Sequence, residues 1–334
     1  MQKILIIQTA FIGDVVLATA LVEKLAACFP GDQIDFLLRK GNETLLLNNP
    51  NINIVLIWDK KDNKIINLLR MIGHIRKRKY DRVINLQRFF STGLITILSG
   101  GKETIGFDKN PLSFLFSKKV KHRIGSKDSL VHEVERNNDL VRSFTDAVPA
   151  KPRMYPSAED IHAVQPWLGK PFITMTPGSV WFTKKYPAEK WGELINQVPN
   201  NYPVYLLGGK ENREECNAIK ESSPGKNIQV LAGQLSFLQS AALMKGAFMN
   251  YVNDSAPLHF ASSVNAPVTA IFCSTVPAFG FTPLSDQSFI VETKEALSCR
   301  PCGLHGKKQC PENHFKCGWG ISTEQLIKPL NLPG

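Results

Sequence analysis

Residues 4–22 read ILIIQTAFIGDVVLATALV. A β-rich apolar run ends at Gln8, and a second apolar run, suited to a helix, begins at Val15. Gly13 and Asp14 stand between the two runs. A charged carboxylate at such a junction has to be paired with a hydrogen-bond or charge partner, exposed to water or used in the protein's chemistry. Burying it without a partner is costly. The stretch predicts a strand, a turn and a helix of an α/β protein, with an acid at the turn.

The alternation of short apolar runs and helix-like stretches continues through the first half of the chain. Strands are predicted at residues 3–8, 33–39, 52–58, 81–87 and 102–107, and helices at 15–29 and 64–79. The strands are nearly continuous in apolar residues, as expected for a parallel sheet that is covered on both faces. This order of elements favours right-handed βαβ units.

A second α/β series follows a stretch rich in proline and polar residues, 147–171. Its strands are predicted at residues 172–179, 203–209, 228–233, 248–254 and 266–273, with helices between them. With 334 residues the chain is longer than one core usually grows. We therefore expect an α/β protein with two Rossmann-like parallel sheets that face a cleft, where ligands bind at the carboxyl ends of the strands. The expected boundaries are a first domain at 1–155, a linker at 156–170 and a second domain at 171–334.

Basic residues are concentrated in the first half. Residues 1–155 hold 25 Lys and Arg against 15 Asp and Glu (+10), whereas residues 156–334 hold 15 against 14 (+1). Such an excess indicates an anionic partner, namely nucleic acid, a membrane face or a phosphorylated substrate, and a well-solvated surface is the alternative. No apolar run reaches the roughly 20 residues that span a bilayer. The start, MQKILIIQ, lacks the cleavage site of a signal peptide, so we expect a cytoplasmic protein.

Asp14 has two interpretations. As a cap, an acid at the start of a helix accepts bonds from backbone N–H groups and suits the helix dipole. As a functional group, it is a base held at the edge of a cleft. Gly13 agrees with both interpretations, because glycine allows a tight turn from strand to helix.

The loop after the first strand of the second half, TPGSVWFTKKYP (176–187), suits a diphosphate. Gly178 and Ser179 are small enough for the backbone to approach a phosphate. Thr183 and Lys184 supply a hydrogen-bond donor and a positive charge, which neutralises a diphosphate leaving group. The alternative is a surface loop with ordinary lysines.

A second glycine-containing loop, LLGGKEN (206–212), ends a strand at Gly208 and Gly209 before a helix begins. It suits close approach by a nucleotide, but it is not a G-x-G-x-x-G motif. Neither that motif nor a Walker A sequence occurs in the chain, which weakens a dinucleotide dehydrogenase interpretation.

The stretch YVNDSAPLHFASSV (251–264) is again a strand, a polar turn and a helix. Asp254 and Ser255 stand where the helix begins, and the free N–H groups of a helix N-terminus hold phosphate well. His259 lies one turn further along. Taken alone, Asp254 is as readily a helix cap, and His259 a packed core histidine.

Four cysteines, Cys299, Cys302, Cys310 and Cys317, lie within CRPCGLHGKKQCPENHFKC. Disulfides are disfavoured in a reducing compartment, and four thiols at close spacing suggest a structural zinc site. The second pair is more widely spaced than in a standard zinc ribbon. Four thiolates leave no open coordination position, so such a metal is structural and not catalytic.

The stretch LLRMIGHIRKRKYDR (68–82) predicts a helix with a basic end and an apolar face. Its most closely spaced cations are Arg76, Lys77, Arg78 and Lys79. A solvated helix is one interpretation, and contact with a membrane surface or an acidic acceptor is the other.

Together these motifs resemble glycosyltransferase family 9, the ADP-heptose:lipopolysaccharide heptosyltransferases, over nearly the whole chain. TAFIGDVVLATALV resembles the family's small-x-x-G-D opening, and YDRVINLQ and TIGF are similar to its next two motifs. FTKKYPAEKW resembles "tKrWP-x-e-x-w", LLGG a glycine turn, and NDSAPLHFASS the "nDSG-x-x-H-x-A-A" motif. The cysteine segment is similar to the C-x-P-C…C-P…H…C stretch of several members.

The resemblance implies a GT-B fold and an inverting transfer that needs no catalytic metal. It implies that the first domain binds a phosphorylated lipid A–inner-core acceptor and the second binds ADP-heptose, at the inner face of the inner membrane. Asp14 would be the general base and Lys184 would contact the donor phosphates. Asp254, Ser255 and His259 would belong to the donor pocket.

Two departures and two alternatives remain. Ala256 stands where the family usually has glycine, and Tyr186 replaces a usual tryptophan. A related transferase that uses another nucleotide-sugar, such as a hexose or N-acetylhexosamine donor, fits the same motifs. A nucleic-acid-binding protein would account for the basic half and the cysteines. However, the cations are not interleaved with aromatic residues, and the cysteines lie in the neutral half.

Overall fold

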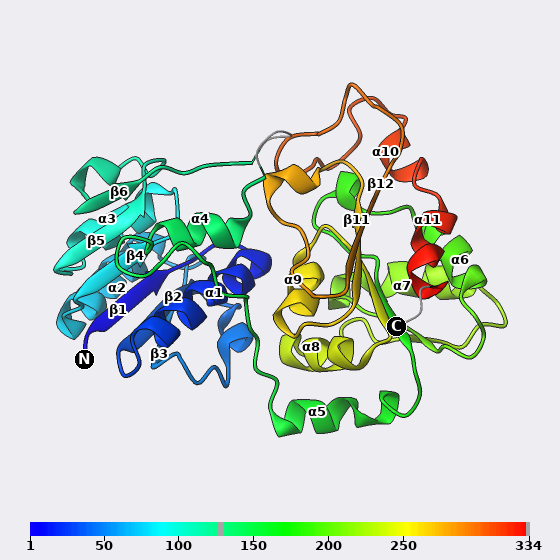
Figure 1. Ribbon diagram of the computed structural model, residues 1–334, viewed down its shortest axis with the longest axis horizontal. Coiled ribbons are helices and arrows are strands. Elements are labelled where there is room, and N and C mark those ends of the chain that lie inside the picture. The colour runs from blue at the N-terminus through cyan, green and yellow to red at the C-terminus, as the bar shows by residue number, and fades with distance from the viewer. Residues whose placement is uncertain (126–129, 332–334) are drawn as a thin grey trace. The chain divides into compact units, whose positions relative to one another are not determined.

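The computed structural model describes residues 1–125 and 130–331 (Figure 1). These residues form two compact units. The first comprises Met1–Gly125 and Val131–Tyr155, and the second includes the chain from Pro156 onward. Each unit is built on its own six-stranded sheet in which all neighbouring strands are parallel. The expected fold class, α/β with two parallel sheets, is confirmed.

The first sheet has the strand order β3-β2-β1-β4-β5-β6. Its strands are β1 (Lys3–Ile7), β2 (Gln33–Arg39), β3 (Ile54–Trp58), β4 (Arg82–Asn85), β5 (Glu103–Phe107) and β6 (Lys118–Val120). The helices of this unit are α1 (Ile12–Cys28), α2 (Lys64–Arg78), α3 (Phe90–Leu98) and α4 (Glu133–Asp139). Helices α1 and α4 pack together, as do α2 and α3 (Figure 1). The apolar run Ile4–Ile7 is fully buried at the centre of this sheet, which agrees with its sequence pattern.

The second sheet has the order β12-β11-β10-β7-β8-β9. Its strands are β7 (Ile173–Thr176), β8 (Val204–Leu206), β9 (Ile228–Val230), β10 (Met249–Asn253), β11 (Val268–Phe272) and β12 (Ser288–Glu292). The helices are α5 (Ala158–Val164), α6 (Ala188–Gln197), α7 (Arg213–Glu221), α8 (Phe237–Gly246), α9 (Ala256–Ser263), α10 (Lys316–Trp319) and α11 (Thr323–Ile327). Helices α6 and α7 pack together, and α8 packs on both α5 and α9.

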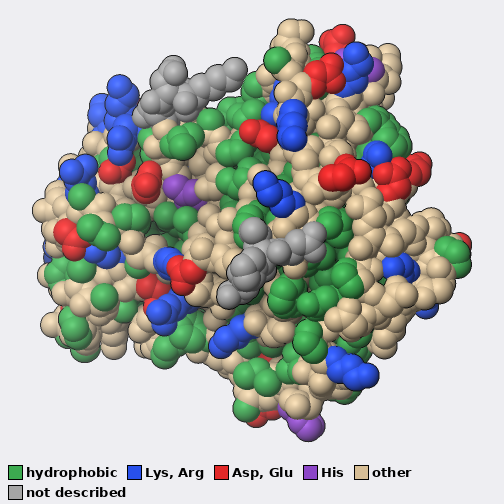
Figure 2. Space-filling model, turned by 45° about the vertical axis from the view of Figure 1, so that its right-hand side comes forward, with side chains coloured by type: hydrophobic (Ala, Val, Ile, Leu, Met, Phe, Trp, Pro, Cys, Tyr) green, Lys and Arg blue, Asp and Glu red, His purple; other side chains and the backbone are tan. Residues whose placement is uncertain are grey.

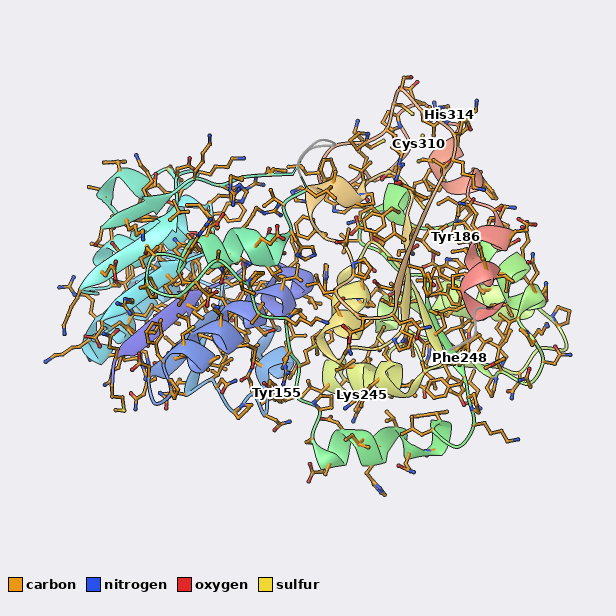
Figure 3. All side chains as sticks on the ribbon, in the orientation of Figure 1. Tyr155, Tyr186, Lys245, Phe248, Cys310 and His314 are labelled. Atoms are coloured by element: carbon orange, nitrogen blue, oxygen red, sulfur yellow. The ribbon has the colours of Figure 1, made fainter. Side chains whose placement is uncertain are left out.

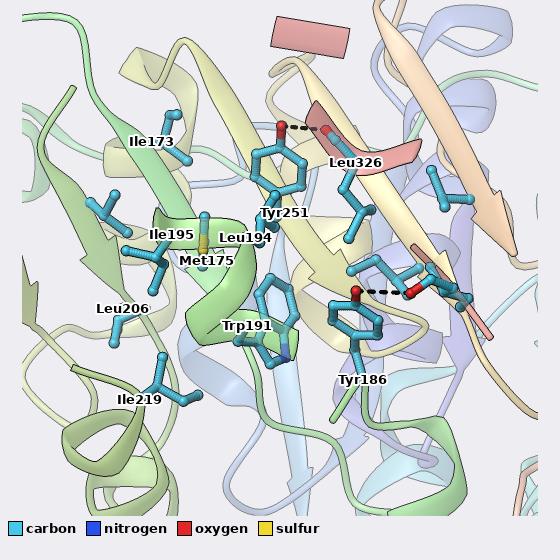
Figure 4. Packing of buried hydrophobic residues seen from close by; sticks show 14 of the residues in the cluster. Ile173, Met175, Tyr186, Trp191, Leu194, Ile195, Leu206, Ile219, Tyr251 and Leu326 are labelled. Atoms are coloured by element: carbon cyan, nitrogen blue, oxygen red, sulfur yellow. Dashed lines mark hydrogen bonds between the residues drawn. The ribbon is translucent and has the colours of Figure 1, made fainter. Parts of the chain in front are cut away.

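Aromatic side chains anchor the end of the chain to the second sheet (Figure 4). Tyr251 Oη donates a hydrogen bond to Leu326 O at 2.7 Å, and Tyr186 Oη donates to Ile321 O at 3.1 Å. Burial raises the pKa of both tyrosines, so their hydroxyls stay protonated and keep donating. Trp191 packs edge-on against Tyr186, with ring centroids 5.4 Å apart. The position that departs from the family's tryptophan is therefore a core position in this chain.

Helix α5 lies within the stretch expected to be a linker. Ser157 caps it, because its hydroxyl accepts a hydrogen bond from Asp160 N at 3.2 Å. The helix packs on α8 in the second unit. Just before it, Tyr155 (labelled in Figure 3) donates to Glu23 Oε2 at 2.9 Å in the first unit. Among the described residues, no helix has the length and apolarity needed to cross a lipid bilayer.

Candidate functional site

The carboxyl end of the second sheet carries an ion pair between Lys184 and Asp254. Asp254 directly follows β10, and Lys184 ends a short 3₁₀ turn after β7. Lys184 Nζ lies 2.7 Å from Asp254 Oδ2, and only 15% and 8% of the two side chains are exposed. Thr275 Oγ1 donates to the same oxygen at 2.6 Å. The pair thus places a compensated ammonium group at the sheet edge where parallel α/β folds bind ligands.

Asn253, the last residue of β10, fastens the loop that carries Lys184. Its Nδ2 donates to Pro177 O at 2.6 Å, and its Oδ1 accepts from Tyr186 N at 3.0 Å. The side chain is fully buried, so both bonds are shielded from water. Sequence reasoning did not single out this residue. The available signal was an amide that ends an apolar strand beside Asp254.

Thr183 is a buried residue of the loop that carries Lys184. The residue is 1% exposed, and its hydroxyl accepts hydrogen bonds from Lys307 N at 2.8 Å and from Ser274 Oγ at 2.9 Å. The Thr183 hydroxyl in turn donates a hydrogen bond to Lys307 O at 3.3 Å. The hydroxyl of Thr183 therefore makes its hydrogen bonds within the protein in this structure. Thr183 anchors the cysteine segment to the Lys184 loop.

The glycines of the two loops make room for Asn212. A Cβ at Gly178 would lie 2.5 Å from Asn212 Nδ2, and one at Gly208 would lie 2.8 Å from Asn212 Cβ. Gly209 N donates to Asn212 Oδ1 at 3.1 Å. The close approach that the glycines allow is thus made by a protein side chain. Ser179 is half-buried beside them, at the start of an exposed loop tip.

Ser255 and His259 belong to the β10–α9 junction. Ser255 is the residue before α9, and its hydroxyl donates to Asn253 O at 3.3 Å instead of capping the helix. The amide groups of the first helical turn are therefore not covered by this side chain. His259 is 4% exposed, and its ring centroid lies 6.3 Å from that of Phe281. It is a buried residue of α9, close in sequence to Asp254.

In the first unit, Asp14 is the third residue of α1, at the carboxyl end of β1. The side chain is half-buried, and its Oδ2 accepts a hydrogen bond from Phe11 N at 3.2 Å. This contact is the one expected of a cap. Gly13 lies inside the first turn of α1. The backbone at this position is helical, so Gly13 itself makes no tight turn.

Lys60 lies near the same edge and was missed by sequence reasoning. Its Nζ donates to Thr9 Oγ1 at 2.8 Å and to Thr9 O at 3.1 Å, next to the β1–α1 turn. Burial, together with the nearby charges of Arg39 and Lys64, lowers the pKa of Lys60 to about 8. The usable signal was a lysine placed two residues after the apolar strand β3.

Four cations at the end of α2 lie elsewhere. Arg76, Lys77, Arg78 and Lys79 form the last turn of α2 and its cap, just before β4 begins. They therefore lie at the amino edge of the sheet, opposite the edge that carries Asp14. Arg78 Nη1 is 3.4 Å from Asp35 Oδ2, and Arg76 Nη1 donates to Leu98 O at 3.3 Å. Gly13, at the start of α1, lies at the carboxyl edge, so it and these cations do not share one edge of the sheet.

Helix α4 contains a buried charged pair that sequence reasoning also missed. Arg136 and Glu133 are 2% and 9% exposed, and Arg136 Nε donates to Glu133 Oε2 at 2.8 Å. Burial raises the pKa of Glu133, and the Arg136 charge opposes that shift. The helix packs on α1, which carries Asp14. Its sequence, EVERNND, shows no apolar period, which is why it was not recognised as a buried element.

The four cysteines of the 299–317 segment line one cavity of about 350 Å³, together with Lys307 and His314. Figure 3 labels Cys310 and His314 there. Nevertheless, among the described residues no three Cys, His, Asp or Glu side chains are placed to hold one metal ion. Burial raises the pKa of Cys302, and that of Cys317 to about 11. The arrangement does not fit the expected structural zinc site.

Comparison with known proteins identifies the family. The profile of glycosyltransferase family 9 (heptosyltransferase) matches residues 68–315. The chain is 26% identical over 280 residues to lipopolysaccharide heptosyltransferase 3 of Escherichia coli, covering 79% of this chain and 82% of that protein. It is 24% identical over 353 residues to lipopolysaccharide heptosyltransferase 2 of Escherichia coli strain K12, covering 99% and 98%. The structure of the E. coli ADP-heptose lipopolysaccharide heptosyltransferase II is similar, with a TM-score of 0.79 at 22% identity over 98% and 97% of the chains.

Two all-parallel sheets and the similarity to that structure define a GT-B fold. The chain belongs to glycosyltransferase family 9 (heptosyltransferase), and the resemblance of its motifs is confirmed.

Proposed function

We propose that the protein transfers a heptose from ADP-heptose to a phosphorylated lipid A–inner-core acceptor. The family and the names of the relatives support this substrate class. The observation that carries the proposal is the Lys184–Asp254 ion pair at the carboxyl edge of the second sheet. Each of the two residues lies in a motif of the second half that resembles the family.

Donor binding is assigned to the second unit. The Lys184 ammonium, already held by Asp254, contacts the diphosphate and offsets the negative charge that grows on it as the glycosidic bond breaks. At the start of α9, Pro257 has no N–H and Leu258 N donates to Ser255 O at 3.0 Å, so the amide left to the donor is Ala256 N. Asn212 and Asn253 keep the surrounding loops in place.

Acceptor activation is assigned to Asp14. The acceptor hydroxyl oxygen attacks the anomeric carbon, the bond from that carbon to the diphosphate oxygen breaks, and the hydroxyl proton passes to the Asp14 carboxylate. ADP leaves with the electron pair. This single displacement inverts the anomeric centre and uses no metal. Asp14 stands in the first turn of α1, at the carboxyl end of β1.

The acceptor's phosphate groups are assigned to Lys60 and its neighbours Arg39 and Lys64. Arg39 ends β2, and Lys60 and Lys64 follow β3, so these cations lie at the same sheet edge as Asp14. A desolvated ammonium interacts more strongly with an anion than a fully hydrated one does. The first half's charge of +10 supports an anionic acceptor over a neutral one.

A donor screen tests the function. The purified protein is incubated with a heptose-free lipid A–inner-core acceptor and with ADP-heptose, UDP-sugars or GDP-sugars in turn. We expect turnover with ADP-heptose and an acceptor product heavier by one heptose in mass spectrometry. If only a hexose or N-acetylhexosamine donor is consumed, the related transferase that uses another nucleotide-sugar is the correct alternative.

We further propose that an anionic membrane surface is a partner of the first unit. Residues 63–102, which include α2 and α3, hold nine Lys and Arg and one acid, Asp81. Asp81 is neutralised by Lys102 at 2.7 Å. Helix α3 has no charged residue. Exposed apolar side chains are common on protein surfaces, as Figure 2 illustrates. An uncharged helix, α3, beside a basic one, α2, nevertheless favours binding to a lipid surface.

Exposed apolar side chains on these two helices give the membrane proposal its test. Ile65, Leu69 and Phe90 are 73%, 58% and 58% exposed. We expect sedimentation with phosphatidylglycerol vesicles but not with phosphatidylcholine vesicles, and a clear loss of binding in Leu69→Glu. Ile161→Glu, which changes an apolar residue of α5 that is 46% exposed, is the matched control. Equal binding of both variants to the anionic vesicles would refute this partner.

A further inference from the structure

Arg300, in the cysteine segment, holds the loop that follows β11. Its side chain is 11% exposed. Nε donates to Cys273 O at 2.7 Å, while Nη2 donates to Thr275 O at 2.7 Å and to Phe272 O at 3.1 Å. Nη2 also lies 2.7 Å from Glu292 Oε2 at the end of β12. A single, mostly buried guanidinium therefore joins three backbone carbonyls of residues 272–275 to the neighbouring strand β12.

The loop held by Arg300 leads directly to the ion pair. Thr275, whose carbonyl Arg300 binds, donates its hydroxyl proton to Asp254 Oδ2 at 2.6 Å. The same carboxylate oxygen lies 2.7 Å from Lys184 Nζ. Direct contacts therefore connect Arg300 to Thr275, Thr275 to Asp254, and Asp254 to Lys184.

The backbone of the same segment reaches the pair from its other side. Cys302 N donates to Ser274 O at 2.9 Å, and Ser274 N donates to Thr183 O at 3.2 Å. Lys307 N donates to Thr183 Oγ1 at 2.8 Å, and Thr183 N donates to Lys307 O at 3.1 Å. Thus the residue before Lys184 and the residue that binds Asp254 are both tied to residues 300–307.

We infer that residues 299–307 position the Lys184–Asp254 pair, and that Arg300 is the positioning residue. The inference rests on the proposed donor-binding role of the pair. It gives the cysteine segment a task that requires no metal. The planar fork of a guanidinium reaches several acceptors in fixed directions, whereas a lysine ammonium at this site keeps the charge but loses that geometry. Arg300→Lys is therefore expected to behave like Arg300→Gln.

The test measures Lys184 itself. Limited acetylation with acetic anhydride, read by peptide mass spectrometry below the unfolding temperature, reports how tightly each lysine amine is held. We expect the acetylation rate of Lys184 to rise roughly tenfold in Arg300→Gln and in Thr275→Val, as contacting groups are coupled. Lys226→Met is the matched control, because Lys226 Nζ also binds a backbone carbonyl, Val198 O at 2.8 Å, but just before β9 begins.

Kinetics give the second readout. Arg300→Gln should raise the KM for the donor about tenfold, and adding Thr275→Val should raise it by less than the product of the two single effects. Fully multiplicative effects, or a Lys184 acetylation rate unchanged by either variant, would overturn the inference. If Arg300→Gln does not fold, Thr275→Val tests the inference, because this variant loses only one hydroxyl. Its Lys184 acetylation rate is then the deciding measurement. Failure of the proposed function is seen separately, as absence of ADP-heptose turnover in the unaltered protein.

Discussion

Asp14 Oδ2 accepts a hydrogen bond from the backbone N–H of Phe11 at 3.2 Å. The carboxylate therefore caps α1 while it stands at the edge of the sheet where the proposed base must be. A cap contributes only about 1 kcal/mol to the free energy of unfolding. A general base contributes roughly 10²–10⁴-fold to the rate. The two roles can be separated because they differ so much in magnitude and in what they affect.

Asp14→Asn should leave the fold intact and abolish most turnover. The amide oxygen still accepts the bond from Phe11 N, but an amide does not take up a proton. We expect kcat to fall roughly 10²–10⁴-fold, with a change in unfolding free energy below about 1 kcal/mol. Asp160→Asn is the control, because Asp160 Oδ2 makes the same contact with Ser157 N at the start of α5. If Asp14→Asn and Asp160→Asn are equally active, Asp14 is a helix cap and is not the general base.

Lys184→Met should weaken donor binding and also destabilise the protein. It leaves the buried Asp254 carboxylate without its cation, which costs about 3 kcal/mol for a well-buried pair. The double variant Lys184→Met/Asp254→Asn removes both charges and should be more stable than Lys184→Met alone, as measured by urea unfolding. Lys185→Met, which breaks the neighbouring 3.0 Å pair with Glu215, should retain donor affinity. A double variant less stable than the single one would contradict a charge-compensated pair.

Lys60→Met should change the pH dependence of both stability and acceptor binding. The folded pKa of Lys60 is lowered to about 8 from 10.5, so the unfolded chain binds the proton more tightly between these values. The contribution of Lys60 to the free energy of unfolding is therefore fully present above pH 10.5. It is lost as the pH falls to about 8. Chemical unfolding across this range should show a steeper rise in stability for the unaltered protein than for Lys60→Met.

Acceptor binding should depend on Lys60 in the opposite sense. Only the protonated amine attracts a phosphate, so the KM for the acceptor should rise as the pH passes 8, and Lys60→Met should lack this rise. Lys61→Met is the control, since Lys61 is an exposed neighbour. Identical KM profiles for the unaltered protein and Lys60→Met would remove Lys60 from the acceptor site.

Thiol alkylation should distinguish two fully buried cysteines from three half-buried ones. Cys216 and Cys273 are fully buried, and burial raises the pKa of Cys216 to about 12 and that of Cys273 well above 9. Cys28, Cys299 and Cys302 are half-buried. Iodoacetamide at neutral pH should therefore modify the second group and spare the first, as read by mass spectrometry. Protection of Cys299 and Cys302 that chelator treatment abolishes would instead show a bound metal.

The sheets were predictable because their strands are apolar runs rich in β-branched residues. The prediction for Ile4–Ile7 and for β10 and β11 needed only the sequence pattern. Strand β6 and helix α4 carry no such pattern: the first is three residues long with two lysines, and the second buries Glu133 and Arg136 against each other. Tertiary contacts alone explain why Glu133 and Arg136 are buried.

The candidate site was predictable in its location but not in its partners. Lys184 and Asp254 follow strands of one parallel sheet, so their meeting follows from topology. The roles of Thr183 and Asn212 depend on residues far away in sequence or on side-chain direction, which spacing does not reveal. The position of Arg76–Lys79 could have been deduced, since a helix that precedes a parallel strand ends at that strand's amino edge.

The two bonds of Asn253 have a consequence for evolution of the family. The amide joins both ends of the loop between Pro177 and Tyr186, while the loop tip at Val180 is 80% exposed. Mutations or insertions at the tip can therefore accumulate without displacing the ammonium near its base. Directed-evolution libraries that aim at new sugar donors should diversify residues 179–181 and retain Asn253. Substitutions at 179–181 then change the loop tip while the base of the loop keeps its position.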